Sequence, residues 1–505
     1  MAGSLHRKTL SVVLWCLVTA VLLTAFGYLC LGNLNAWHIE DYDEARHGVN
    51  AYEMTQNGDY LVHTYQGEPD LWNTKPPLSF WLVSIAYRIF GYTPFALRFF
   101  AGLSTLLGAL AITLLMARRY GKWAVPLVLL MFTANSILYG LHFARFGDAD
   151  SQYQFFFTLA MLCLLLSFKN FKSLYGCGVF FSLAFLEKSF HALTIPAVCF
   201  LTLVFTGRLK ELTLKRVLLL LASGLALVLV WAAARISRDG FAFFTNSFEL
   251  DVASRVGGGV ADPAQANMST WAYNFGVLLG LPYVVGRLSR FFLPCNLVCL
   301  SFGAVCTAIL LIRKVKLTPF TRYALVACLL WLLVPVLLYS LLGVKFCWYL
   351  YSVTMALPAL TCILFFAAVR SGFGKRIITA AMCVFAALLI ALSTVNILNV
   401  ATIEFDQTFQ AFIAASLDRD LDGGKHAYII YAENGYTDWM PGDMLTAQLY
   451  GDLTCRNGGL AAFEEDGADS LLFIARTNNE ELIAELWTKE SVFNEDYYCI
   501  AFEKF

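Results

Sequence analysis

Long apolar runs separated by short polar stretches dominate the chain. A helix that crosses a bilayer needs roughly 20 consecutive apolar residues. Runs near that length lie at residues 10–34, 96–117, 123–141, 152–168, 173–186, 192–205, 214–236, 293–312, 323–343, 347–369 and 377–400. This pattern predicts a mostly α-helical fold, a polytopic transmembrane bundle of about eleven helices.

The first long polar stretch, residues 35–93, carries two helical patterns of its own. They cover residues 43–56 and 77–90, and the prolines at 76 and 77 suit the start of the second. We expect both to be amphipathic helices on the outer membrane surface. A further interfacial helix is predicted over residues 271–292, which carry Arg287 and Arg290.

Hydropathy falls at about residue 404, where globular patterning begins. Residues 406–421 have a helical pattern and another helix opens near Asn479, while residues 426–432, 470–475 and 497–502 are strand-like runs. The chain is therefore predicted to hold a transmembrane domain, residues 1–403, and a small α/β domain, residues 404–505.

Composition excludes a soluble enzyme. Apolar residues make up 59% of the chain and charged residues 14%, with a mean hydropathy of +0.64, whereas soluble domains carry about 25% charged residues. The formal net charge of zero gives no reason to expect a nucleic-acid partner. The sequence also lacks the Gly-x-x-x-x-Gly-Lys and Rossmann glycine patterns that bind soluble nucleotides.

The distribution of Lys and Arg predicts the orientation. Basic residues gather in alternate loops, at residues 7–8, 118–122, 169–172, 208–216, 313–322 and 370–376. By the positive-inside rule these loops and the N-terminus face the cytoplasm of a plasma membrane, so residues 35–93 and 404–505 lie outside. If residues 271–292 span the membrane instead, the C-terminal domain moves inside. The first run is longer than a signal-peptide core and is expected to be a retained anchor.

Two cysteines lie in the predicted external domain. The others fall in or beside apolar runs, where cysteine acts as a small hydrophobic residue. Cys455 and Cys499 could pair in an oxidising compartment, and the sequence leaves this open.

Ionisable residues gather at the predicted outer ends of the helices. They are Asp41, Asp43, Glu44, Arg46, Lys75, Arg145, Asp148, Asp150, Glu187, Lys188, His191, Arg255 and Lys345. Carboxylates with several fixed cations suit a transfer from a phosphate leaving group, since a base activates the acceptor while cations stabilise the departing phosphate. Because no soluble-nucleotide motif is present, a lipid-borne phosphate donor fits best.

An ordered set of short motifs carries a family resemblance. The set is Asp43-Glu44-Ala45-Arg46, Gly58-Asp59-Tyr60, Lys75-Pro76-Pro77-Leu78 with Trp81, Ala96-Leu97-Arg98, Arg145-Phe146-Gly147-Asp148-Ala149-Asp150, Glu187-Lys188-Ser189, Arg255, and Ser340-Leu341-Leu342-Gly343-Val344-Lys345 leading to Tyr349. Over roughly residues 10–360 the chain resembles the membrane-bound GT-C glycosyltransferases. It is most similar to the lipid A aminoarabinose transferase and protein O-mannosyltransferase superfamily.

The resemblance implies roles for particular residues. Asp43 matches the catalytic aspartate, a general base or acceptor-orienting group, and Glu44 completes that catalytic pair. The positions implied to hold the polyprenyl phosphate are Lys75, Arg255, Lys345 and Tyr349. Those implied to support the site or face the acceptor are Arg46, Arg145, Asp148, Asp150 and Lys188. The chain departs from the family where Ser189 replaces the usual glycine and where Trp348-Tyr349-Leu350-Tyr351-Ser352 replaces Tyr-x-Leu-Pro.

The resulting hypothesis is an inverting transfer of a sugar from a polyprenyl-phosphate donor at the extracytoplasmic membrane face. The acceptor is a glycolipid, a protein or a cell-envelope polymer. The first alternative is a transporter or flippase of lipid-linked sugars, which would place charges along a path through the membrane. Here the helix centres are nearly free of ionisable residues, which favours an enzyme. A non-catalytic scaffold is the second alternative, and it predicts that the outer charges tolerate substitution.

Plainer readings exist for some of these residues. Asp43 and Glu44 also suit the first turn of any surface helix, and Lys345 and Arg255 suit anchors at helix ends. Asp41 is expected to be an ordinary loop acid. No spacing of metal ligands is evident, so no metal site is predicted and a divalent metal is left open as a cofactor. The histidines at 38, 47, 63 and 191 are expected to be isolated on the surface.

Overall fold

The computed structural model describes residues 2–254, 268–281, 294–372, 375–403, 408–417, 425–432, 435–467, 469–486 and 491–501. The chain divides into two compact units. The helical unit comprises Met1–Gly32, Thr74–Leu78 and Ala101–Thr402, and the mixed unit comprises Asn33–Asn73, Ser79–Phe100 and Ile403–Phe505. The mixed unit thus joins the C-terminal segment to most of the first polar stretch. Independent folding of residues 1–403 and 404–505 stays a prediction.

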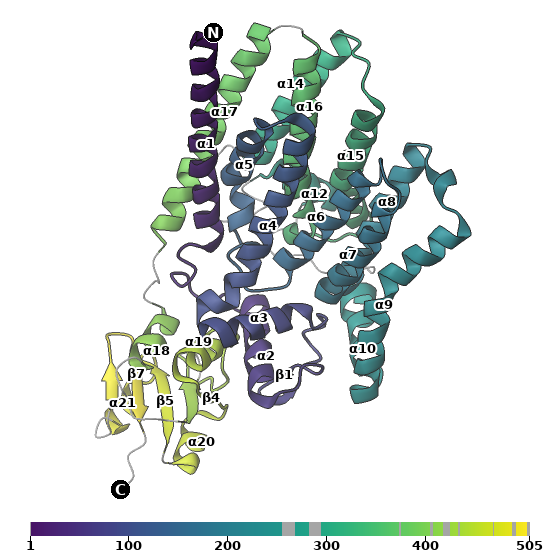
Figure 1. The fold of residues 1–505 in the computed structure, drawn as a ribbon. Helices are drawn as coiled ribbons and strands as arrows, with labels where there is room; N and C mark the ends of the chain where they lie inside the picture. Colours follow the sequence, from purple (N-terminus) through teal and green to yellow (C-terminus); the bar gives the residue numbers. More distant parts are fainter. Residues whose placement is uncertain are drawn as a thin grey trace. The chain divides into compact units, whose positions relative to one another are not determined.

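Every predicted apolar run contains an α-helix (Figure 1). These helices are α1 Ala2–Leu31, α4 Pro94–Tyr120, α5 Ala124–Ala134, α6 Asp150–Leu166, α7 Ser173–Lys188, α8 Thr194–Phe205, α9 Leu214–Asp239, α14 Cys295–Ile312, α15 Pro319–Leu341, α16 Ser352–Arg370 and α17 Lys375–Ala401. Within the described residues, 8 helical stretches are long and apolar enough to cross a membrane, one of them joining α7 and α8. The chain is an integral, multi-pass membrane protein, as predicted.

Short elements connect these helices. They are the 3-10 turns η1 Ser136–Tyr139, η2 Ser189–Leu193, η3 Leu209–Glu211 and η6 Cys347–Leu350, the π-turn η4 Glu249–Ala253, and the helices α10 Ala242–Phe248 and α12 Thr270–Leu279. The predicted interfacial helix over residues 271–292 overlaps α12, and its second half lies outside the described residues. A continuous apolar core joins the inner faces of the bundle, including Phe132, Phe157 and Trp331. On α9 Leu218 and Leu229 are exposed, as expected of a lipid-facing helix.

The mixed unit contains both helices predicted in the first polar stretch. They are α2, Asp43–Asn57, and α3, Leu78–Phe90, and between them a small hairpin pairs β1, Thr64–Tyr65, with β2, Glu68–Pro69. Val49 and Tyr87 are buried in one apolar cluster with Leu445 and other residues of the C-terminal segment, within the same unit. These helices therefore belong to the packed core of the mixed unit.

A five-stranded sheet with flanking helices forms the rest of the mixed unit (Figure 1). Its strands are β3 His426–Ile430, β4 Thr454–Cys455, β5 Ser470–Ala475, β6 Ser491–Phe493 and β7 Tyr497–Ala501, and its helices are α18 Phe409–Leu417, α19 Pro441–Gly451, α20 Gly459–Asp466 and α21 Glu480–Leu486. The strand order is β4-β3-β5-β7-β6, with β3 parallel to β4 and β5, and β7 antiparallel to β5 and β6. The small α/β fold predicted from the strand patterns is confirmed.

Alternation along the strands separates two apolar layers. Ile429 and Phe473 pack with α2, α3, α18 and α19 on one face of the sheet. Tyr428 and Leu472 pack with α20 and α21 on the other face. Successive side chains of a strand point to opposite faces of the sheet. Alternate residues of β3 and β5 therefore pack into the two different apolar layers.

The two cysteines of the C-terminal sheet do not pair. Cys455 and Cys499 are buried free thiols. They lie on β4 and β7, which are separated by β3 and β5 in the sheet. Adjacent strands lie about 4.8 Å apart, so these thiols are too distant to form a disulfide.

Candidate functional site: a buried ionic cluster and an acidic segment

A buried cluster of charged side chains lies in the helical unit. It joins the segment between η1 and α6, the first residue of α6 and the last residue of α7. His142 Nδ1 lies 2.5 Å from Asp148 Oδ2 and 3.7 Å from Asp150 Oδ2. Lys188 Nζ, at the end of α7, donates to Asp150 Oδ1. All four residues are buried. The structure thus brings together Asp148, Asp150 and Lys188, which the resemblance had implied, and adds His142.

Aromatic rings surround this ionic cluster. The imidazole of His142 stacks on Trp348 with ring centroids 4.2 Å apart. Lys188 Nζ lies 4.7 Å from the centre of the Tyr349 ring, a cation–π contact. His191 packs edge-on against Tyr349 at 4.3 Å. Trp348 and Tyr349 belong to the segment 348–352, in which the chain departs from the family pattern. That segment therefore supplies the rings that contact His142 and Lys188.

Nearby cations control the charge of Asp148. Burial raises the pKa of this carboxyl, but the charges of His142, Lys75 and Lys188 outweigh it and hold the pKa well below its usual range. Lys75 follows Thr74, whose hydroxyl donates to Asp251 Oδ2 at 2.8 Å. Because the charge of Lys75 lowers the pKa of Asp148, Lys75 is within electrostatic reach of the cluster. Asp148 remains an anion that can orient cations or hydrogen-bond donors.

Unusual backbone conformations occur at two positions of the cluster. His142 has φ 59° and Ser189 has φ 39°. Positive φ is costly for residues other than glycine and is tolerated best by Asn, Asp and His. Ser189, the C-cap of α7, occupies the position where the family usually has glycine. This backbone conformation of Ser189 ends α7 directly after Lys188.

The ligand atoms of His142, Asp148 and Asp150 lie within 4.8 Å of one another, so this group could hold a metal ion. One imidazole nitrogen and two carboxylate oxygens suit a divalent cation such as Mn²⁺ or Zn²⁺. The Lys188 ammonium already neutralises Asp150 and competes with a metal for that oxygen.

The surface position predicted for the other histidines is wrong for two of them. His47 and His63 are buried and stack on Phe80, with ring centroids 4.1 and 4.8 Å apart. Neither belongs to the metal-capable group found among the described residues.

The acidic segment lies in the mixed unit, where Glu44 is fully buried. Arg98 donates from Nε to Glu44 Oε1 at 2.6 Å and from Nη2 to Oε2 at 2.8 Å. Its guanidinium also donates to the carbonyls of Leu34, Trp37 and His38. Both oxygens of Glu44 are thus held by one cation, as in a structural bidentate ion pair. Asp43, by contrast, is partly exposed at the first position of α2.

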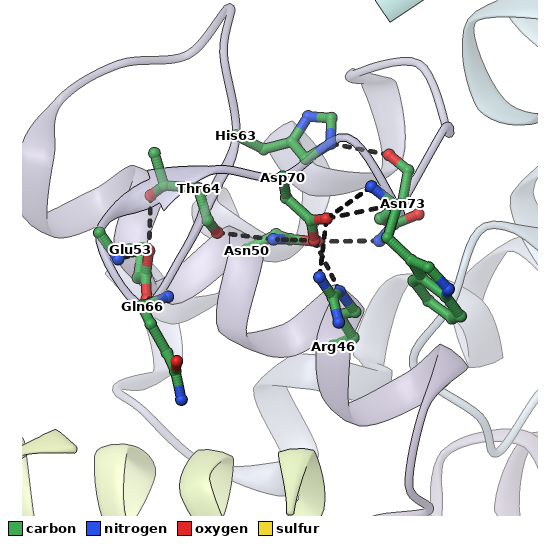
Figure 2. A network of polar contacts seen from close by, with 10 residues as sticks. Arg46, Asn50, Glu53, His63, Thr64, Gln66, Asp70 and Asn73 are labelled. Atoms are coloured by element: carbon green, nitrogen blue, oxygen red, sulfur yellow. Dashed lines mark hydrogen bonds and ion pairs between the residues drawn. The ribbon is translucent and has the colours of Figure 1, made fainter. Parts of the chain in front are cut away.

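Arg46 organises the loop that follows α2 (Figure 2). It makes a bidentate pair with Asp70, with distances of 2.8 and 2.9 Å. Asn50 Nδ2 donates to Asp70 Oδ2 at 3.0 Å and to the Thr64 carbonyl at 2.6 Å. The guanidinium lies 4.1 Å from the centre of the Tyr65 ring. Arg46 therefore fastens the hairpin loop to α2.

Three further residues implied by the resemblance are Arg145, Lys345 and Arg255. Arg145 Nη1 donates to the carbonyls of Leu29 and Gly32 at 3.3 and 2.6 Å, where it caps the C-terminal end of α1. Lys345 is partly exposed just before η6. Arg255 lies outside the described residues.

Sequence reasoning missed His142 and Arg98 as site residues. His142 lies six residues before Asp148 in an apolar context, and a lone histidine there carries no recognisable spacing. Arg98 interrupts an apolar run with a charge. A charge within such a run requires a buried partner, which could have pointed to Glu44.

The apolar helices, the five-stranded sheet and the buried ionic cluster define a polytopic membrane protein. Residues 74–234 match the family described as dolichyl-phosphate-mannose-protein mannosyltransferase. ArnT from Cupriavidus metallidurans, solved with undecaprenyl phosphate, superposes with a TM-score of 0.67 over 98% of both chains at 15% identity. The superposition shows that the two chains share a fold, which confirms the predicted fold class. The family match agrees with the resemblance given by the motifs.

Curated relatives match part of the chain. An undecaprenyl phosphate-alpha-4-amino-4-deoxy-L-arabinose arabinosyl transferase of Proteus mirabilis is 27% identical over 285 residues, covering 54% of this chain and 49% of the relative. A Yersinia enterocolitica protein of the corresponding name is 29% identical over 231 residues, covering 44% of this chain and 40% of the relative. The chain thus spans about half the length of the curated relatives it matches, or less.

Proposed function

We propose that the protein is an inverting glycosyltransferase that moves a sugar from a polyprenyl phosphate to an acceptor. The observation that carries the proposal is the buried cluster of Asp148, Asp150 and Lys188 within a fold shared over nearly its whole length with a protein solved with undecaprenyl phosphate. The names of the curated relatives support an undecaprenyl-phosphate-linked sugar as donor. The acceptor is a glycolipid, a protein or a cell-envelope polymer.

The proposed chemistry is a single displacement. An acceptor hydroxyl or amine attacks the anomeric carbon, the bond from that carbon to the phosphate oxygen breaks, and polyprenyl phosphate leaves. Asp43 takes the acceptor's proton, or orients the acceptor for attack. Glu44 acts as a positioning residue, because its carboxylate is held by Arg98. The proposed ligands of the departing phosphate are Lys75, Arg255, Lys345 and Tyr349.

The roles proposed for the supporting residues follow their contacts. Lys188 balances Asp150, and Asp148 orients the His142 ring. Arg46 and Arg145 act through the segments they hold. A divalent metal at His142, Asp148 and Asp150 is compatible with the donor atoms, and Lys188 is the competing cation.

The proposed orientation follows the distribution of basic loops. The N-terminus faces the cytoplasm of a plasma membrane, and the acidic segment with the C-terminal sheet faces outward. A lipid-linked sugar presented at the outer face then meets its acceptor outside the hydrocarbon core.

A transfer assay tests this function. It uses purified protein in nanodiscs, radiolabelled undecaprenyl-phosphate sugars as donors and a membrane extract as acceptor. Wild type should transfer label, and Asp43→Asn should lower kcat by at least about 100-fold because the general base is lost. Donor binding should persist in the variant. Parallel reactions with EDTA, followed by Mn²⁺, establish whether a metal contributes.

Asp41→Asn is the matched control. It makes the same charge change two residues earlier, and its amide oxygen can still accept the Gly442 N–H that Asp41 Oδ1 accepts at 2.8 Å. Near-normal transfer by Asp43→Asn would reject its catalytic role. Movement of lipid-linked sugar across liposome bilayers without transfer would favour the flippase.

A further inference from the structure

Helix α6 carries a stripe of buried polar side chains whose hydrogen-bonding groups are unused. Gln154 is 1% exposed, and neither its Nε2 nor its Oε1 has a hydrogen-bond partner among the described residues. The same holds for the buried hydroxyls of Ser151 and Thr158. An unpaired buried amide or hydroxyl costs about 1–3 kcal/mol. Three such groups on one apolar helix indicate that a ligand supplies their missing hydrogen bonds.

The stripe continues from the ionic cluster. Asp150, Gln154 and Thr158 are spaced four residues apart, so they lie on one face of α6, each about 6 Å further along the helix. Side chains on a helix tilt toward its N-terminus, so Gln154 reaches back over the turn that carries Asp150. Lys188 donates to Asp150 at the head of the stripe.

The first turn of α16 lies beside this end of α6. Helix α16 packs against α6, and Trp348, just before α16, stacks on the imidazole of His142 in the ionic cluster with ring centroids 4.2 Å apart. The hydroxyl of Ser352, the first residue of α16, is buried and also lacks a partner among the described residues. Both helices therefore present unused polar groups near the ionic cluster.

The chemistry of these groups selects the ligand. Gln154 offers an unused donor and an unused acceptor, so its partner must both accept and donate hydrogen bonds, as sugar hydroxyls do. A phosphate diester can only accept, and a polyprenyl chain can do neither. Cations at Lys75 and Lys188 suit the phosphate that carries the sugar.

We infer that the stripe of Ser151, Gln154 and Thr158 binds the sugar of the lipid-linked donor, and that Gln154 determines which sugar is accepted. This inference rests on the proposed function, since it assigns the donor's sugar to a subsite next to the ionic cluster. Gln154 is a specificity residue here, and the proton transfer belongs to Asp43.

Binding to nanodisc-embedded protein separates the sugar from its carrier. The probes are bare undecaprenyl phosphate and undecaprenyl phosphate linked to mannose, glucose or 4-amino-4-deoxyarabinose. Wild type should bind one sugar-linked probe more tightly than the bare lipid. Gln154→Leu should reduce that preference by at least tenfold, roughly the effect of a lost buried hydrogen bond, and leave affinity for the bare lipid unchanged.

Stability supplies a second readout. Gln154→Leu and Thr158→Val remove unpaired polar atoms, so both should raise the melting temperature of the ligand-free protein while weakening sugar binding. Thr133→Val is the matched control, because Thr133 is equally buried in α5 but its hydroxyl donates to the Leu129 carbonyl at 2.8 Å. That control should keep the wild-type sugar preference.

Several outcomes overturn the inference. They are an intact sugar preference in Gln154→Leu, the lack of any preference in wild type, and a change confined to the acceptor KM. A wild-type protein that binds a sugar-linked probe but transfers no sugar refutes the proposed function instead. In that case the sugar subsite still stands on the Gln154→Leu result.

Discussion

Two adjacent carboxylates show how strongly surroundings decide the role of a residue. Glu44 is buried and held by Arg98 through both oxygens, whereas Asp43 is partly exposed at the start of α2. A carboxylate bound on both oxygens by one guanidinium is poorly suited to take up a proton. Asp43 therefore remains the better candidate for the base.

Asp443 illustrates a buried acid outside the membrane-spanning segments. Burial raises its pKa from 3.8 to about 7, although the Tyr431 hydroxyl donates to Asp443 Oδ2 at 2.6 Å. An acid with a raised folded-state pKa binds its proton more tightly when folded. Its contribution to stability is therefore greatest below about pH 4 and is lost as the pH rises toward 7.

Asp443→Asn should remove this pH dependence. The amide oxygen can still accept from Tyr431, so the variant should gain on the order of 1–3 kcal/mol over wild type at pH 8 and little at pH 4.5. Melting curves of the two proteins between these pH values measure the difference. Glu464→Gln, at an exposed position of α20, should follow wild type throughout. A constant difference between Asp443→Asn and wild type would contradict the assignment.

At the scale of elements, α18 and α19 hold the segment that leads into α2. Gln410 on α18 donates from Nε2 to the Ile39 carbonyl and accepts the Ile39 N–H at Oε1, both at 2.8 Å. Asp41 accepts the N–H of Gly442 at the start of α19. These contacts lie four and two residues before Asp43. The C-terminal helices therefore constrain the backbone that carries the proposed base.

Gln410→Leu should loosen that backbone. It leaves the Ile39 N–H and carbonyl unpaired, at a cost of about 1–3 kcal/mol, so kcat for transfer should fall several-fold or more while donor KM stays unchanged. Steady-state kinetics and melting temperatures of the same samples separate positioning from unfolding. Gln448→Leu is the matched control, a buried glutamine of α19 without a bond to Ile39. Equal loss of activity in both variants would reject a specific role for Gln410.

At the scale of the whole molecule, the orientation of the chain in the membrane decides which donors and acceptors can reach the proposed site. The apolar helices establish a multi-pass membrane protein, and the basic loops predict an outward-facing C-terminal unit. Donor and acceptor access both depend on that prediction.

Reporter fusions test the orientation in a bacterial host. Alkaline phosphatase fused after Phe505 should be active and a green fluorescent protein dark, because the C-terminus is predicted to lie outside. Fusions after Gly372, in a loop predicted to be cytoplasmic, should behave in the opposite way. Fluorescence after Phe505 would place the C-terminal unit inside and reverse the proposed orientation.

Local signals were enough for much of the architecture. Run length and periodicity predicted every apolar helix, and the strand pattern over residues 470–475 matches β5. They did not predict the helices α10, α19 and α20. They also did not predict the strands β4 and β6, because two or three residues carry too little periodicity. Asp148, Asp150 and Lys188 were identifiable through their motifs.

The sequence by itself thus determined a polytopic helical protein, its apolar segments, its small α/β unit and the residue types of the proposed phosphate site. Only the tertiary structure decided that His142 joins Asp148 and that Arg98 holds Glu44. It also decided that Gln154, four residues after Asp150 on α6, has no hydrogen-bond partner among the described residues. Helix and strand formation depends on neighbouring residues, whose spacing can be read directly. Ion pairs and desolvation instead depend on groups distant in the chain, so they emerge only when the chain folds.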